Sequence, residues 1–282
     1  MPSRSNLDHI VAAMRAQVDT IHAHRAAAHR ARDPEAVHRM RVAVRRLRAI
    51  LRASRSLFAE DWTEGLRREL KWLGIALGRV RDLDVLRAQV RSQIGRRPAG
   101  GRVARHRLRQ HIADDRARAV AALRRALDGT RCARLLAQID ASLAAPPACT
   151  DDVSLTDIAA AEFDKLRRAV KKLPKDPPAE ELHEIRIKVK HARYAAELAQ
   201  ENVGRRAERF VDKAKALQDI LGAHQDAVVA ERYVRRAAGQ APGARALARQ
   251  IATRQEERRS EAREAFVEQW PKLKRRGRRA WD

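Results

Sequence analysis

The sequence predicts an all-α protein built from two helical halves, and three observations favour this fold class. Hydrophobic residues occupy 44% of the 282 positions, aromatic residues only 4% and charged residues 34%, a composition typical of helical bundles. Hydrophobic residues recur every three or four positions along most of the chain, and no segment alternates as a half-buried strand would. The same order of helical segments occurs twice, which indicates an internal duplication.

The first half is placed at residues 1–145, and its opening helix at residues 6–30, where hydrophobic residues recur on one side. A second helix is expected to start with Asp33 as its N-cap and Pro34 in the first helical position, and to run to about Phe58. Proline suits that position because its fixed φ is helical and its missing N–H is not needed there.

Three further helices are expected to complete the first half. The segment 61–64, Asp-Trp-Thr-Glu, is typical of a capping box and predicts the start of a third helix. Proline and glycine in residues 96–101 predict a break. A fourth helix is then expected at about 102–127 and a short fifth helix at about 130–144. The prolines at 146–147 mark the boundary between the halves.

The second half is placed at residues 150–270 and repeats the plan of the first. Ser154, followed by Asp157, is expected to cap its first helix. The expected elements are a helix from Ser154 to about Lys172, a break at 174–178, and helices from near Glu180, over about 205–236 and over about 241–269. A basic tail is expected at residues 271–282. The repeated order favours two helical bundles packed about a pseudo-two-fold axis.

One helix of each half carries nearly the same row of cationic side chains. The row consists of His38, Arg41, Arg45 and Arg48 in the first half and of His183, Arg186, Lys190 and Arg193 in the second. The positions fall at i, i+3, i+7 and i+10, which is one face of a helix. Because like charges on one face repel each other, a row that occurs twice indicates an anionic ligand. The alternative is that each row is a solvated face paired with neighbouring carboxylates.

A second pair of helices also matches between the halves. Lys71, Gly78 and Asp82 in the first half correspond to Lys215, Gly222 and Asp226 in the second, at an offset one residue shorter than that of the cationic rows. The aspartates are expected to orient neighbouring Arg or Lys side chains. A metal site is not expected, because no His or Cys has the spacing of a zinc site.

The charge balance predicts a polyanionic partner. The chain has 61 Lys and Arg against 36 Asp and Glu, a formal charge of +25. Such an excess points to nucleic acid, an anionic membrane surface or a phosphate polymer, and arginine presents a fork that matches phosphate. The two cysteines predict no disulfide framework. We expect no signal peptide and no membrane insertion, and hence a cytoplasmic protein.

With these motifs the sequence resembles a known family, the CHAD domains, which are α-helical and named for their histidines. The family pattern has a His-x-x-Arg-Val helix and a Leu-Gly-x-x-Arg-Asp-x-Asp-Val helix, matched by residues 38–48 and 77–85. Its second half has His-x-x-Arg-Ile-x-x-Lys-x-x-Arg-Tyr and Leu-Gly-x-x-x-Asp, matched by residues 183–194 and 221–226. Both halves match in the right order and spacing.

The resemblance implies a pair of four-helix bundles with a basic central cavity that binds inorganic polyphosphate. The implied ligand positions are His38, Arg41, Arg45, Arg48, Lys71, His183, Arg186, Lys190, Arg193 and Lys215. The supporting positions are Arg46, Arg52, Arg81, Asp82 and Asp226. His38 and His183 are candidates either for phosphate contacts or for structural hydrogen bonds at a helix start.

The functional hypothesis is therefore a non-catalytic polyphosphate-binding protein, with polyphosphate granules as a candidate location. The alternative is a helical nucleic-acid-binding protein, although aromatic residues for base stacking are scarce. An enzyme is not expected, since the sequence contains no P-loop, no Glu-x-Glu-x-Lys motif and no nucleophile beside a base. No cofactor is expected.

Overall fold

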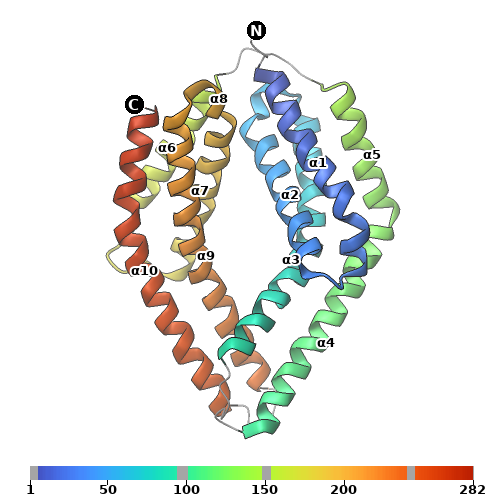
Figure 1. The fold of residues 1–282 in the computed structure, drawn as a ribbon, viewed down its shortest axis with the longest axis vertical. Helices are drawn as coiled ribbons and strands as arrows, with labels where there is room; N and C mark the ends of the chain where they lie inside the picture. Colours follow the sequence, from blue (N-terminus) through green and yellow to red (C-terminus); the bar gives the residue numbers. More distant parts are fainter. Residues whose placement is uncertain (1–5, 94–100, 148–153, 240–244, 282) are drawn as a thin grey trace.

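The computed structural model describes residues 6–93, 101–147, 154–239 and 245–281 (Figure 1). Throughout these ranges the regular structure is helical, and no strand occurs in them. The predicted all-α fold is therefore confirmed. The break predicted at 96–101 lies almost entirely outside the described residues, as does Cys149.

The helices of the first half follow the prediction closely, except at the end of the second helix and at the start of the third, which begins at Glu60 and so places Asp61 inside its first turn instead of at the predicted cap. They are α1 (Asn6–Arg30), α2 (Pro34–Ala53), a 3-10 turn (Arg55–Leu57), α3 (Glu60–Gln93), α4 (Gly101–Asp128) and α5 (Thr130–Ala144). Asp33 caps α2 as predicted, since its carboxylate accepts the Glu35 N–H at 2.9 Å. The predicted end of this helix near Phe58 is wrong, because the N–H and hydroxyl of Ser54 both donate to the Ile50 carbonyl and close the helix.

The helices of the second half also match, except at the C-terminal end. They are α6 (Leu155–Lys171), α7 (Ala179–Leu198), the short α8 (Gln200–Val203), α9 (Arg205–Gly239) and α10 (Arg245–Trp281). Ser154 caps α6 as predicted, accepting the Asp157 N–H at 3.1 Å. The predicted helix end near Gln269 is wrong, because α10 continues through Pro271 to Trp281. Burial of its last turns favours this continuation, since Leu273 is fully buried.

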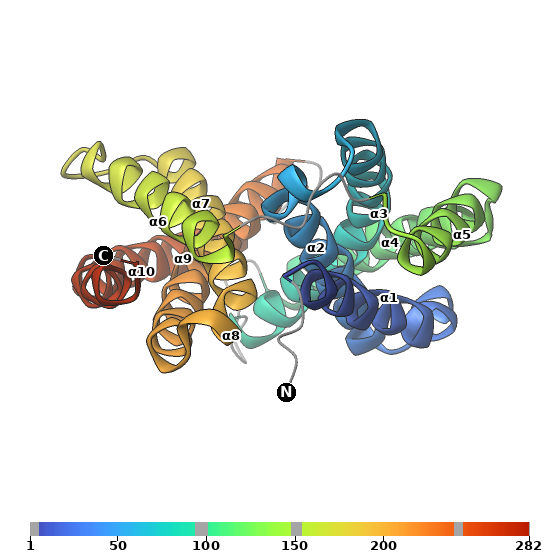
Figure 2. The ribbon, with the colours of Figure 1, turned by 90° about the horizontal axis from the view of Figure 1, so that it is seen from above.

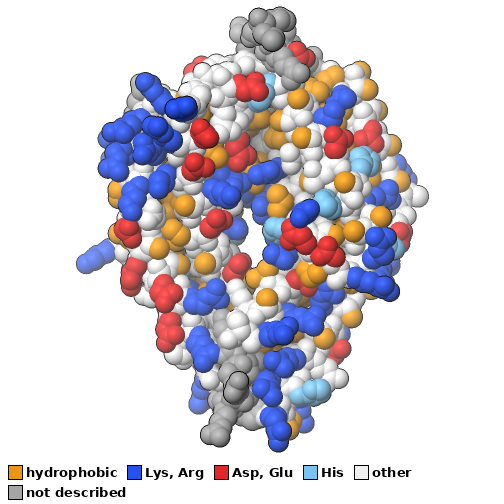
Figure 3. Space-filling model, in the orientation of Figure 1, with side chains coloured by type: hydrophobic (Ala, Val, Ile, Leu, Met, Phe, Trp, Pro, Cys, Tyr) orange, Lys and Arg blue, Asp and Glu red, His pale blue; other side chains and the backbone are white. Residues whose placement is uncertain are grey.

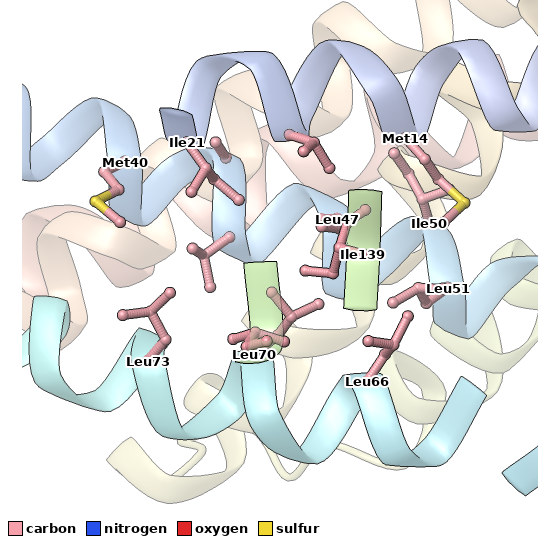
Figure 4. Packing of buried hydrophobic residues seen from close by; sticks show 14 of the residues in the cluster. Met14, Ile21, Met40, Leu47, Ile50, Leu51, Leu66, Leu70, Leu73 and Ile139 are labelled. Atoms are coloured by element: carbon pink, nitrogen blue, oxygen red, sulfur yellow. The ribbon is translucent and has the colours of Figure 1, made fainter. Parts of the chain in front are cut away.

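Three hydrophobic clusters hold the molecule together. The first fills the first half, where α1, α2, α3 and α5 interdigitate (Figure 4), and extends to Leu155 of α6 and Leu198 of α7. The third fills the second half between α6, α7, α9 and α10. The second cluster lies where α3 and α4 meet α9 and α10, at the lower end in Figure 1, and includes Leu86, Leu108, Val234 and Ile251. The two halves are thus joined by a core of their own.

The halves are also in contact at the level of α2 and α7, which pack against each other. Seen from above, α1 to α5 and α6 to α10 form two separate groups (Figure 2). Between them the space-filling view shows an opening, with Lys and Arg side chains along its edge (Figure 3). The elements on its two sides are α2 and α3, and α7 and α9. The pseudo-two-fold axis stays a prediction, and the expected boundary at residue 270 falls inside α10.

Gly277 of α10 is a position where the packing requires glycine. A Cβ placed there would lie 2.3 Å from two ring atoms of Phe163 in α6. Phe163 is 1% exposed and its ring packs edge-on against Phe210, with centroids 5.5 Å apart, so it has no room to withdraw. The Gly277→Ala variant is therefore expected to lose about 1–3 kcal/mol of unfolding free energy through overpacking, measured by urea denaturation.

Gly65 of α3 provides the control for this measurement, because a Cβ there would have nothing within 4 Å. Gly65→Ala is expected to gain up to about 1 kcal/mol, as alanine favours a helix interior over glycine. Equal shifts of the two variants in the same direction would contradict the packing of α10 on α6.

Candidate functional site

The cationic rows of α2 and α7 lie on helices that pack against each other across the junction of the halves. In α2 the row runs beside the apolar stripe that enters the first core, so its side chains are half-buried at their stems. Arg45 spans the junction, because its Nε donates to the hydroxyl of Tyr194 in α7 at 3.4 Å. This hydrogen bond places the cationic row of α2 next to α7.

Six side chains from four helices form what we call the central cluster. They are Arg41 and Arg45 of α2, Asp82 of α3, Arg186 and Lys190 of α7, and Asp226 of α9. Charges of the first half act on the groups of the second: Arg45 and Arg41 lower the pKa of Arg186 and of Lys190, and Asp82 raises that of Asp226. The two rows therefore converge, instead of lying on opposite outer surfaces.

Lys190 shows most clearly how crowded these positive charges are. Burial is the largest cause that lowers its pKa, and Arg45, Arg186, Arg48 and Arg41 lower it further, to about 8. Burial also lowers the pKa of Arg41 and of Arg186. The cations of the central cluster repel each other and have lost part of their hydration. An anion that binds here offsets both effects, so its binding is favoured.

The two aspartates are placed to hold the arginines from the neighbouring helices. Arg41 pairs with Asp82, with Nη2 and Oδ1 3.3 Å apart. Burial raises the pKa of Asp82 and of Asp226, while Arg41 and Arg186 act in the opposite direction on both. The Asp82 side chain is still 58% exposed, so the arrangement is open to solvent on one side and a ligand can reach it.

Comparison with known proteins identifies the family. The profile of the CHAD domain matches residues 12–235. The chain belongs to the CHAD domain family. Two uncharacterized proteins of Mycobacterium tuberculosis are 29% identical to it over 212 residues, which is 71% of this chain and 40% of theirs. The matched region thus spans less than half the length of these relatives.

Two solved structures share the fold. PptA from Streptomyces chartreusis superposes with a TM-score of 0.77 and 25% identity, over 95% of this chain and all of that one. The CHAD domain from the plant Ricinus communis gives a TM-score of 0.66 and 25% identity, over 98% of this chain and 92% of that one. Both comparisons include nearly all of this CHAD chain, whereas the family profile ends at residue 235.

The two histidines that open the CHAD rows occupy similar surroundings. His38 and His183 are half-buried, and the Nδ1 atom of each is buried without a hydrogen-bond partner among the described residues. Burial lowers the pKa of His38, and Arg81 lowers it further, so the surroundings favour the neutral imidazole. The structural hydrogen bond considered for these histidines is thus missing at both Nδ1 atoms in the described part of the chain.

The remaining residues that the sequence predicts as ligand positions differ in how open they are. Lys71 and Lys215 are exposed, on the same faces of α3 and α9 as the aspartates of the central cluster. Arg48 is half-buried, and its pKa is lowered by burial and by Arg67. Arg193 is 5% exposed, lies 4.5 Å from the ring centre of Tyr194 and pairs with Glu197 at 3.5 Å. Arg193 therefore contacts protein groups on several sides.

Among the supporting positions, Arg52 is engaged between the halves. Its guanidinium forms two hydrogen bonds with the Glu162 carboxylate of α6, at 3.1 and 3.4 Å. His191, the counterpart of Arg46, lies close enough that Arg52 adds to the effect of burial in lowering its pKa to about 3. Arg46 is half-buried, and its Nε has no partner within the described ranges. Arg52 and Glu162 thus join α2 to α6.

Two features of the site were missed from the sequence. The first is that an arginine lies over each of the two matching glycines: the Nε of Arg41 is 3.5 Å from a Cβ built at Gly78, and that of Arg186 is 3.7 Å from one at Gly222. The contact of Arg45 with Tyr194 was missed as well. The matching offsets of the glycines were the available signal for the first.

No group of three or more His, Cys, Asp or Glu side chains among the described residues is arranged to hold a metal ion. No described helix combines the length and the apolar character needed to cross a membrane.

Proposed function

We propose that this CHAD protein binds inorganic polyphosphate without catalysing its turnover, in the opening between the halves. The observation that carries the proposal is the convergence of cationic rows from α2 and α7 on the central cluster, where burial and, after it, the surrounding arginines lower the pKa of Lys190 to about 8. The ten proposed ligand positions are the eight residues of the two rows, together with Lys71 and Lys215. A cytoplasmic location, with association to polyphosphate granules, is part of the proposal.

The spacing of the rows supports a linear phosphate polymer as the ligand. Side chains at i, i+3, i+7 and i+10 of a helix present charge about once per 5.4 Å turn, which matches a ligand with regularly repeated charges. Arginine binds phosphate through two parallel hydrogen bonds. Arg41 is held by its ion pair with Asp82, which limits the side-chain entropy that this arginine loses on binding.

Tight binding without catalysis is supported by the chemistry of the central cluster. Its four cations are donors only, and its two carboxylates face arginines instead of a nucleophile. We expect no phosphate release from polyphosphate when the protein is incubated with magnesium. Release at a rate proportional to protein concentration, and lost in a variant of Asp82, would contradict this part of the proposal.

The salt dependence of binding is expected to be steep. Each phosphate contact releases counterions, with a slope of about −0.7 to −0.9 in log affinity against log salt for nucleic acids. Isothermal titration with long-chain polyphosphate at several salt concentrations is expected to give a slope equivalent to several contacts, and tripolyphosphate a smaller one. Equal slopes for the two ligands would contradict a row of subsites.

Nucleic acid is the alternative partner, favoured by the charge of +25. A competition experiment separates the two, with polyphosphate bound and single-stranded DNA added at equal phosphate concentration. Polyphosphate is expected to stay bound, because the central cluster has Tyr194 as its aromatic neighbour and that ring is buried, so bases have nothing to stack on. Displacement by DNA would favour the alternative.

A further inference from the structure

A second concentration of positive charge lies on the outer side of the second half. Between α6 and the last turns of α10 is a cleft of about 460 Å³, lined by Arg167, Arg168, Val170, Lys171, Trp270, Lys274 and Arg278. On the face shown in Figure 3, Lys and Arg side chains gather over this end of α10. Helices α7 and α9 stand between the cleft and the central opening (Figures 1 and 2).

The cleft exists because α10 continues beyond Pro271. Trp270, Lys274 and Arg278 follow one another at intervals of four residues and so share a face of α10. Leu273 and Gly277, which are buried against α6 and its neighbours, fix that face in place. The CHAD profile ends at residue 235, so the cations of α10 are not part of the family match.

The cations of the cleft are largely without internal partners. Arg167 pairs with Asp164 at 2.8 Å, whereas no ion pair of Arg168, Lys171, Lys274 or Arg278 occurs within the described residues. Arg168, Lys171 and Arg278 lie in the last turns of their helices, where the helix C-terminus favours a cation, but Lys274 lies more than one turn before Trp281 and has no such explanation. The cleft therefore has charge available for an external anion.

The floor of the cleft favours a phosphate chain over a nucleic acid. Trp270 packs against the third hydrophobic cluster and is half-buried, so its ring is only partly open for stacking with bases. We infer that this cleft is a second binding site for the phosphate chain, used by polymers long enough to extend beyond the central opening. The inference rests on the proposed function.

Lysine acylation followed by mass spectrometry tests both sites in one sample. Lys190 reports on the central cluster, Lys171 and Lys274 on the cleft, and Lys213, exposed on the face of α9 away from Lys215, is the control. Long-chain polyphosphate is expected to protect Lys190, Lys171 and Lys274 but not Lys213. Tripolyphosphate at a low ratio to protein is expected to protect Lys190 alone.

The outcomes distinguish the two claims. Protection of Lys190 without protection of Lys171 and Lys274 by the long chain overturns the second site and leaves the proposed function standing. Protection of the cleft lysines alone supports the second site and overturns the central one. If single-stranded DNA protects Lys171 and Lys274 as well as polyphosphate does at equal phosphate concentration, the cleft is a general polyanion surface and the assignment to a phosphate chain is wrong.

Charge reversal at the cleft gives an independent test by affinity. Lys274→Glu with Arg278→Glu is expected to weaken long-chain binding by about tenfold, since two phosphate contacts are lost, and to leave tripolyphosphate binding unchanged. Arg245→Glu with Arg249→Glu is the matched control, because these residues have the same spacing, are exposed and lie at the other end of α10. Equal losses in both double variants would show a general charge effect and overturn the site.

Discussion

Replacing Arg41 and Arg186 together by glutamate is expected to weaken polyphosphate binding by at least about a hundredfold. Arg41 pairs with Asp82 of α3, and the charge of Asp226 of α9 favours the charged form of Arg186, so each arginine already has a carboxylate of another helix near it before the ligand arrives. A hydrogen bond to a charged group contributes about 1.5–3 kcal/mol, and losing two of them accounts for the expected factor. The added negative charges repel the polymer and increase the loss. Isothermal titration calorimetry measures the change.

A control with the same change in net charge separates the site from the overall field. Arg39 and Arg235 have side chains 58% and 66% exposed, and each pairs with a glutamate of its own helix. Arg39→Glu with Arg235→Glu is expected to change affinity only a few-fold, because exposed charges are screened within about 10 Å at moderate salt. Equal losses in the two double variants would mean that affinity follows total charge and that Arg41 and Arg186 have no special place.

A neutral version of the central variant protects the conclusion against unfolding. Glutamates at these positions would face Asp82 and Asp226, and four acidic groups together destabilise a fold. Arg41→Gln with Arg186→Gln keeps polar side chains of similar length and relieves the crowding of cations. It is expected to unfold at or above the temperature of the parent, while still losing most of the affinity. A loss of affinity confined to the glutamate variant would point to misfolding.

Local sequence signals were sufficient for most of the fold. Asp33 and Ser154 mark helix starts because an oxygen side chain accepts a backbone N–H, which is a property of a few consecutive residues. The end of α10 could not be obtained in this way. A proline inside a helix removes one hydrogen bond, and only the burial of Leu273 and Gly277 against the second half explains why the helix continues.

The candidate site, too, was predictable from local sequence only in part. The row positions follow from helical periodicity within each half, and the resemblance to CHAD domains added the expectation that the rows face each other. Which members meet depends on the packing of α2 on α7, which no local pattern encodes. Arg193 has the same place in its row as Arg48, yet Arg193 is buried against Tyr194 and Glu197, and nothing in the spacing separates these two residues.

Raising the pH from about 7 to about 9 is expected to weaken binding by about tenfold through Lys190. Its pKa lies at about 8 in the free protein, against an ordinary value of 10.5. Bound phosphates favour the charged amine and raise this pKa, so that binding takes up a proton once the pH exceeds about 8. Affinity is therefore level below that pH and falls above it. Calorimetry in buffers of different ionisation enthalpy measures the proton uptake directly.

The stability of the free protein is expected to respond in the opposite direction. Because the pKa of Lys190 is lower in the folded state than in the unfolded chain, the unfolded state binds more protons between about pH 8 and 10.5, and the free energy of unfolding rises across that interval. Lys190→Arg keeps its charge throughout and is expected to remove both the fall in affinity and the rise in stability. If affinity and stability of the parent protein change in the same direction in this interval, Lys190 is not the group that titrates. Loss of the proton from Lys190 relieves repulsion by the arginines and so stabilises the free protein, whereas the same loss weakens the binding of phosphate.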